Sequence, residues 1–519
     1  MERLSQRRLD PRKTSQRCHF LRERRVILSA CWTLYVAIFL GLFSGVGIGI
    51  GDNGDGVRVT SPAGLNPQTE SGLLRGQGYV VTEFVSAASR NPVSVFSRVT
   101  SLHYPTANAY VLTLMGVLSP DRSVSLFSLG WLYLIVGLTI IWLAPLNKVL
   151  GPTVITMGTL ALAPFLRWTI SAFADTPAFF GFAAVLIASV SLLSRLDSKE
   201  FFSVNVLLWW GLLLVALSKA AYVVAIPIVL LVFFLTVVVF KLAVLRKSKL
   251  LPLFALTAVG LSVVAGVSAV QFSSSDRQQA SVVNNHHFVM SVVVPNYPTE
   301  IVENAIPESI RDLAPEGYWP RTEDWRDVPG WEETMKDTAL VTELRLALFA
   351  QPALLWELMS SAVSRSTTPE LDYLVPNTWQ PDDPPLLSVL PWTLYLSTTW
   401  LVHALLAPLS VSWLSIPLLI VTLMGALGLV VFRETTRGKN GPNKSRNFLA
   451  LMTFSGLLAG ALAGAAILGD GFAELEKHLI MTSFLFTVFA LSSVVLLGRE
   501  VVAWLSPIIN SRKPARAQT

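Results

Sequence analysis

Charged residues and cysteines are both scarce in this 519-residue chain. Only 14% of the residues are Asp, Glu, Lys or Arg, whereas 52% are hydrophobic and the mean hydropathy is +0.55. A soluble domain carries about a quarter charged residues, so this composition excludes an ordinary soluble protein and predicts a polytopic membrane protein. The two cysteines, Cys18 and Cys31, lie in the basic tail and the first apolar run. No disulfide can therefore hold a large external loop together.

The basic residues form short clusters between apolar runs, although the net charge is +6. This distribution argues against a nucleic-acid partner and marks the cytoplasmic ends of membrane spans. The first cluster precedes the apolar run 26–50, which is long enough to cross a bilayer and lacks a small-residue cleavage pattern. We therefore expect an uncleaved signal anchor with a cytoplasmic N-terminus.

The remaining apolar runs predict an all-α polytopic membrane protein of the cell membrane, with about ten transmembrane helices and both termini in the cytoplasm. Runs 105–118 and 386–409 are interpreted as external interfacial helices, because crossings there would turn basic loops outward. The predicted parts are a basic cytoplasmic tail (1–25), an N-terminal transmembrane module (26–272) with a first external loop (51–104), an external loop region (273–385), a C-terminal interfacial helix with transmembrane helices (386–505) and a cytoplasmic tail (506–519).

The region 273–385 differs from the other connections in the sign of its charge. It contains 18 Asp and Glu against 7 Lys and Arg, whereas the cytoplasmic connections are basic. This reversal favours an external location. Its tryptophans could stack on sugars or form the core of a small domain: Trp319, Trp325, Trp331, Trp356 and Trp379. The pair His286–His287 is interpreted as a loop pair, without the sequence context of a metal site.

An acidic loop follows the first span directly. Gly51–Arg58 reads Gly-Asp-Asn-Gly-Asp-Gly-Val-Arg, which places Asp52 and Asp55 three residues apart and Arg58 just after them. Turn chemistry alone explains Asp52 and the glycines, since Asn-Gly and Asp-Gly are strong turn formers. It explains less well why Asp55 and Arg58 follow at once. We interpret the loop as part of an active site that faces away from the cytoplasm.

The predicted topology gathers ionisable residues from five separate connections on this external side. Because ionisable groups near a bilayer are costly to place, their concentration at one face indicates a functional site. Each residue also has a structural explanation, as a solvated loop residue, a helix N-cap or a snorkelling cation. The candidates are Asp52, Asp55, Arg58, His103, Asp175, Lys219, Asp470, Glu474, Glu476, Lys477 and His478.

Three of these features together resemble the GT-C superfamily of integral-membrane glycosyltransferases. They are the acidic loop after the first span, a second acid in Phe173-Ala-Asp175-Thr-Pro, and a lysine in Leu217-Ser-Lys219-Ala-Ala-Tyr222 at the tip of a helical hairpin. The likeness covers roughly residues 26–272 and 411–497 and is closest to bacterial surface-glycan hexose transferases with an Asp-Asn-Gly-Asp loop. No WWD-like acceptor motif is present.

The resemblance implies transfer of a monosaccharide from a polyprenyl-phosphate carrier to an extracytoplasmic glycan or lipid acceptor, by an inverting displacement. Asp55 is the expected catalytic base, with Asp52 as second choice. Asp175 is expected to orient hydroxyls, and Lys219, with Arg58 or Lys477, to face the lipid phosphate. The other expected substrate-binding residues are His103, Asp470, Glu474 and His478. No cofactor is required, although a divalent metal is compatible with this chemistry.

Two other functions fit parts of the pattern. A transporter or flippase of lipid-linked glycans would place ionisable groups and broken helices near the bilayer midplane, whereas the mid-span positions here are apolar. A membrane anchor that displays 273–385 as a glycan-binding domain would not depend on the acids of the spans.

Overall fold

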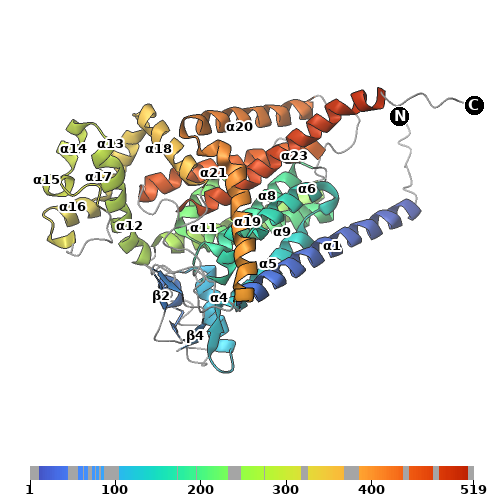
Figure 1. Ribbon diagram of the computed structural model, residues 1–519, viewed down its shortest axis with the longest axis horizontal. Coiled ribbons are helices and arrows are strands. Elements are labelled where there is room, and N and C mark those ends of the chain that lie inside the picture. The colour runs from blue at the N-terminus through green and yellow to red at the C-terminus, as the bar shows by residue number, and fades with distance from the viewer. Residues whose placement is uncertain are drawn as a thin grey trace, which may run out of the picture.

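The computed structural model describes residues 11–44, 57–61, 63–67, 73–75, 78–80, 83–86, 105–171, 173–194, 196–231, 247–273, 275–316, 325–367, 385–435, 444–471 and 478–511. Its apolar part is a helix bundle (Figure 1). The bundle comprises α1 (Pro11–Ser44), α5 (Leu126–Leu143), α6 (Leu146–Ala161), α7 (Ala163–Leu166), η1 (Arg167–Ile170), α8 (Thr176–Leu192), α9 (Ser198–Ala216), η2 (Ala220–Val224), α11 (Lys247–Ser273), α19 (Pro385–Ser410), α20 (Ser412–Thr435), α21 (Lys444–Asp470) and α23 (Ile480–Ser511).

The described residues contain five helices that are long and apolar enough to cross a membrane, or up to eight if each bent helix pair is one span. The all-α polytopic class is therefore confirmed, and the number ten stays a prediction. Helix α1 begins at Pro11, well before the apolar run, because arginine and lysine favour helix and proline suits a first turn. Helix α6 and the α7–η1 segment form one of the bent pairs, with a bend of 68° between them.

Helix α19 was interpreted as interfacial, and the structure gives it a direction unlike that of the neighbouring spans. Its Leu396–Ser410 part makes an angle of 94° with the Ser415–Gly428 part of α20. In Figure 1 it runs vertically across the bundle, whereas α1, α20 and α23 run lengthwise. The other expected interfacial helix is α4 (Ala107–Leu118), which is too short to span and is capped by Thr106, whose side chain accepts from the Ala109 amide at 3.2 Å.

Short strands that the sequence does not predict lie in the first external loop and directly before α5. They are β1 (Leu65–Pro67), β2 (Leu73–Arg75), β3 (Gly78–Val80), β4 (Glu83–Ser86) and β5 (Ser123–Ser125), with the four-residue helix α2 (Val57–Thr60) before them. An antiparallel sheet has the order β1-β4-β5, with Leu65 opposite Ser86 and Glu83 opposite Ser125. Strands of three or four residues are too short to show a periodic pattern, so the sequence does not reveal them.

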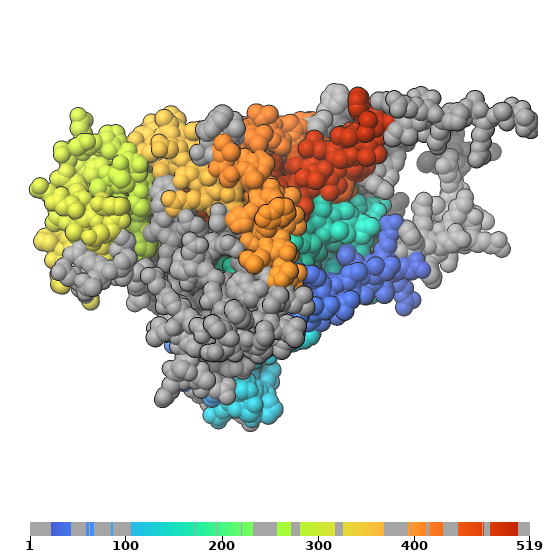
Figure 2. All heavy atoms as spheres, viewed as in Figure 1, coloured from blue at the N-terminus to red at the C-terminus, as the bar shows by residue number. Residues whose placement is uncertain are grey.

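The region 275–367 is a helical unit rather than an irregular loop. Its helices are α12 (Ser275–Phe288), the π-helical turn η3 (Val289–Val293), α13 (Val294–Asn296), α14 (Thr299–Ala305), α15 (Glu308–Arg311), η4 (Trp325–Asp327), α16 (Trp331–Lys336), α17 (Thr338–Phe349) and α18 (Pro352–Arg365). The unit has its own hydrophobic core, which also takes in the end of α21 through Ala463, Ala466 and Ile467. It forms the yellow-green lobe at the left of Figure 2.

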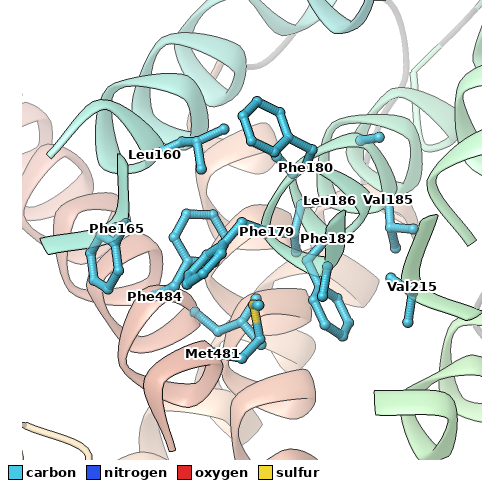
Figure 3. Packing of buried hydrophobic residues seen from close by; sticks show 14 of the residues in the cluster. Leu160, Phe165, Phe179, Phe180, Phe182, Val185, Leu186, Val215, Met481 and Phe484 are labelled. Carbon is cyan, nitrogen blue, oxygen red and sulfur yellow. The ribbon is translucent and has the colours of Figure 1, made fainter. Parts of the chain in front are cut away.

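Helix α8 is the centre of the bundle, since all seventeen of its residues are buried. Figure 3 shows its Phe179 facing Phe165 and Phe484, and the three ring centroids lie 5.5–6.0 Å apart. On another face α8 approaches α9 closely, because both helices carry glycine at the crossing. A Cβ on Gly181 would lie 2.7 Å from the Gly211 carbonyl oxygen. Small residues of this kind let helix backbones meet in a membrane.

The helices of the bundle end on two opposite sides. Because α8 and α9 are neighbours joined by a short turn, the end of α8 and the start of α9 lie on one side. At one end, Arg25 Nη2 donates to the Ala144 carbonyl at 3.3 Å, and Asn447 Nδ2 donates to the Lys148 carbonyl at 2.7 Å. This basic end carries the α5–α6 and α8–α9 turns. The opposite end carries the first residues of α8 and the last residues of α9 and α21. The expected site residues of these helices therefore lie together at the end away from the basic turns.

The α8–α9 crossing gives a first prediction. Gly181→Ala should lower the apparent unfolding midpoint of the detergent-solubilised protein, since its Cβ overlaps backbone and overpacking costs about 1–3 kcal/mol. Gly158→Ala is the matched control, because nothing lies within 4 Å of a Cβ there. That substitution should be neutral or stabilise by about 0.5–1 kcal/mol. Equal midpoints for the two variants would contradict the close crossing.

Candidate functional site

A small pocket lies between η2 and the last turns of α21. Lys219 and His478 form its polar side, and Lys219 Nζ lies 2.8 Å from His478 Nδ1. Because a lysine ammonium can only donate, Nδ1 accepts the hydrogen bond and the imidazole proton belongs on Nε2. The remaining lining residues are Ala221, Tyr222, Leu462, Ala465 and Ala466. The pocket thus combines one ammonium group with an apolar wall.

Asp175 is joined to this pocket by Tyr222. The carboxylate lies at the start of α8 and is only 3% exposed. The Tyr222 hydroxyl donates a short hydrogen bond to Asp175 Oδ1. A buried carboxylate is costly without a donor, so this bond stabilises Asp175 where it lies. Tyr222 lines the pocket and holds Asp175, and therefore connects the acid to Lys219 and His478.

The local conformation of η2 explains why Lys219 and Tyr222 act together. Lys219 is the residue before this 3₁₀ turn, and the Tyr222 amide donates to the Lys219 carbonyl at 2.9 Å. This bond closes the turn, and both side chains line the pocket. The Tyr222 ring also makes an edge contact with Phe182 of α8, with centroids 6.2 Å apart. The turn is therefore fixed by packing as well as by hydrogen bonds.

The segment that precedes Asp175 is held by buried polar groups from α4 and α5. Asn108 Nδ2 donates to the Phe173 carbonyl at 2.6 Å, and the Tyr133 hydroxyl donates to Asn108 Oδ1 at 2.5 Å. Thr176 Oγ1 donates to the Trp168 carbonyl at 2.7 Å. These bonds tie the segment to two neighbouring elements, so α4 has a defined role as a support of the site.

The helical unit fixes the other wall of the pocket. Arg345 of α17 donates from Nε to the Leu468 carbonyl at 2.6 Å, and from Nη2 to Asn285 Oδ1 at 2.9 Å. An arginine at the carbonyl end of a helix satisfies its free acceptors and complements its dipole. Gly471 then ends α21 with φ of +61°, and a Cβ there would lie 2.9 Å from the His287 carbonyl oxygen. Only glycine suits this position.

Of the ten residues expected to act in the site, the structure brings together Asp175, Lys219 and His478. Arg58 lies in α2 and Asp470 is the last residue of α21, but both side chains lie outside the described residues. The expectations for Asp52, Asp55, His103, Glu474 and Lys477 also fall outside the described part of the chain. Asp175, Lys219 and His478 come from three separate connections, as the topology required.

Sequence reasoning missed Tyr222, Asn108 and Arg345 as site residues. Tyr222 could have been found from its spacing, since a turn at Lys219 brings the residue three positions later back beside it. Asn108 and Arg345 had no such signal. They act across 65 and 123 positions of the chain, respectively, on partners that only the fold brings near.

Two tryptophans of the helical unit are part of its core and are not exposed for stacking on sugars. Trp325 and Trp331 are each 3% exposed and pack in its core. His286, which accepts from Trp331 Nε1 at 3.0 Å, belongs with His287 to helix α12, so the expectation of a loop pair was wrong. Burial lowers the pKa of His287 to about 4, which keeps it neutral near pH 7. Among the described residues, no group of three or more His, Cys, Asp or Glu could hold a metal ion.

These helices and their one-sided polar site define an integral membrane protein with many spans. The chain belongs to the YfdI N-terminal transmembrane domain family, whose model matches residues 13–507. The family match thus covers the bundle and the helical unit alike. No curated protein and no solved structure gives a significant match to the chain.

The support of the Asp175 segment gives a second prediction. Asn108→Leu removes the hydrogen bond to the Phe173 carbonyl and the one from the Tyr133 hydroxyl, and both groups are buried. The substitution should therefore cost about 1–3 kcal/mol in stability. Tyr133→Phe should be harmful alone but nearly neutral in the Asn108→Leu background, with a coupling of about 0.5–3 kcal/mol. Apparent unfolding midpoints of the four proteins measure this cycle. Additive effects would show that the two side chains do not act as a unit.

Proposed function

We propose that this protein is a GT-C-like membrane glycosyltransferase that moves a monosaccharide from a polyprenyl-phosphate carrier to an extracytoplasmic glycan or lipid acceptor. The observation that carries the proposal is the pocket in which Lys219 and His478 meet Tyr222, which in turn holds Asp175. The membership in a transmembrane-domain family supports the membrane setting. The resemblance of the acidic loop and the Lys219 turn to GT-C enzymes supports the reaction class.

The pocket suits the phosphate of the donor and of the product. An ammonium group stabilises a phosphate as a compact positive charge, and a neutral imidazole with its proton on Nε2 offers a further donor. The apolar wall of Leu462, Ala465 and Ala466 suits the first carbons of a prenyl chain. A phosphate that enters would compete with His478 for the Lys219 ammonium. The Lys219–His478 contact is then the resting arrangement of a site for anions.

Asp175 and Tyr222 are suited to sugar hydroxyls. A carboxylate accepts hydrogen bonds from hydroxyl groups, and Tyr222 both donates and accepts. Since Tyr222 already occupies Oδ1 of Asp175, the second carboxylate oxygen is the one that would bind a sugar. This pair would orient the transferred sugar next to the phosphate that it leaves.

Asp55 is proposed as the catalytic base, with Asp52 as the second choice. The base takes the proton of the acceptor hydroxyl while that oxygen forms a bond to the anomeric carbon. The bond from the anomeric carbon to the phosphate oxygen breaks, and its electron pair leaves with the polyprenyl phosphate. A positioned base contributes about 10²–10⁴-fold to such a step. Lys219 neutralises the charge that develops on the leaving phosphate, with Arg58 or Lys477 as further cations.

The proposal also assigns an orientation in the membrane. The basic end of the bundle, with the turns near Ala144 and Leu193, would face the cytoplasm together with both termini. The pocket, Asp175 and the acidic helical unit would then face outward. His103, Asp470 and Glu474 are retained as proposed substrate-binding residues on that side.

The third prediction tests the base. Asp55→Asn in the full-length protein should abolish transfer of a radiolabelled sugar from its polyprenyl-phosphate carrier, because an amide cannot accept the proton. Asp52→Asn should have a smaller effect. Asp121→Asn is the control, since it removes an exposed acid that only caps a turn through Ser119 and Ser123. Full activity of Asp55→Asn with normal insertion would refute this assignment.

Vesicles that contain the full-length protein allow transfer to be distinguished from transport. If wild-type protein catalysed no transfer but moved labelled glycan lipid between the leaflets, the flippase would replace the transferase.

The fourth prediction tests the phosphate pocket. Lys219→Gln should raise KM for the lipid-linked donor and lower kcat, because the ammonium contacts phosphate in both the bound and the leaving state. Lys219→Arg should retain part of the activity. Direct binding of a polyprenyl phosphate, measured by scintillation proximity, should weaken in Lys219→Gln and not in Asp121→Asn. Unchanged binding in Lys219→Gln would place the phosphate elsewhere.

A further inference from the structure

The corner between α17 and α18 carries an apolar patch that faces outward from the helical unit. Leu346 is 62% exposed, Phe349 58% and Trp356 39%. The intervening Ala350, Pro352 and Ala353 are exposed as well. We call residues 346–356 the corner patch. A polar protein surface rarely offers large apolar side chains next to one another, so the corner patch is a candidate contact surface.

The position of α18 sets the depth of this corner. Helix α18 packs against α20 and α21, and Ser364 Oγ donates to the Ser410 carbonyl at 2.7 Å, just where α20 begins. Met359 Sδ lies 3.7 Å from where a Cβ on Gly464 would be. Gly464 precedes the end of α21 by six residues, which is about 9 Å along a helix. Helix α18 therefore lies beside the last turns of a membrane span.

The polarity of α17 changes along its length in the same sense. The exposed residues of its first half are Thr338, Ala339, Thr342 and Glu343, three of which are polar. The exposed residues of its last turns are Leu346 and Phe349. On the inner face Leu344 and Leu348 are buried throughout. A helix that is polar at one end and apolar at the other end of its outer face fits an element that passes from water into lipid.

We propose that the corner patch is embedded in the outer leaflet of the bilayer and that it docks the helical unit on the membrane. The α17–α18 pair, bent by 96°, enters the leaflet and returns, with Phe349 at its tip and Trp356 at headgroup level. Arg345, one residue before the patch, faces the end of α21. Helix α17 would then be held on one side by lipid and on the other side by the hydrogen bond from Arg345 to the α21 carbonyls. This surface does not depend on the proposed reaction.

The test uses the full-length protein in phosphatidylcholine–phosphatidylglycerol vesicles, with Cys18 and Cys31 replaced by Ser. Nitroxide labels at Phe349→Cys and Trp356→Cys report accessibility to oxygen, which concentrates in lipid, and to a nickel chelate, which stays in water. Glu300→Cys on α14 is the aqueous reference, since that side chain is exposed on the same unit. The oxygen-to-nickel ratio should be severalfold higher at positions 349 and 356 than at position 300.

A ratio at either corner position equal to that at position 300 would overturn the proposal. The corner patch would then face water and be a surface for a protein partner. Fluorescent labels at the same cysteines give a second measure, because lipids with brominated acyl chains should quench them at 349 and 356 and not at 300. The exposure of both side chains makes the substitutions compatible with the fold. Size-exclusion profiles verify this before reconstitution.

Discussion

The hydrogen bond between Tyr222 and Asp175 is the interaction on which the site depends. It links the start of α8 to the turn after α9, and thus connects a buried acid to the pocket of Lys219 and His478. The rest of the bundle keeps these two helix ends together. Gly181 and Gly211 let α8 and α9 meet closely, and the rings around Phe179 fix α8 against α23. Without this packing, neither the acid nor the tyrosine would have a defined position.

The helical unit and the bundle meet at the end of α21, where three constraints coincide. Arg345 binds the last carbonyls, Gly471 turns the chain against His287, and Ala466 both lines the pocket and enters the core of the unit. The unit is therefore a part of the pocket's framework. This arrangement disfavours an anchor that displays an independent domain, because the unit shares its core with α21.

Composition and hydropathy were sufficient to predict a polytopic helical protein, since long apolar runs have few alternatives in water. The sign of loop charge placed Asp175, Lys219 and His478 at one end, and the structure has them there. The end of α9 just before Lys219 was also predictable, because Ser218 and Lys219 interrupt an apolar run. Other features could not be predicted, because they depend on contacts between distant positions. They are the short strands, the helical structure of 275–367 and the roles of Asn108 and Arg345. The apolar pattern of a twelve-residue helix such as α17 is the same in a small domain and in an interfacial helix, so it does not distinguish the two.

The most direct test of the account is a structure of the protein in a lipid nanodisc with a polyprenyl phosphate bound. The phosphate is expected within hydrogen-bond distance of Lys219 Nζ and His478, with the first prenyl carbons against Leu462 and Ala465. Asp175 should keep its bond to Tyr222. A phosphate bound away from these residues, with the Lys219–His478 contact unchanged, would contradict the assignment of the pocket.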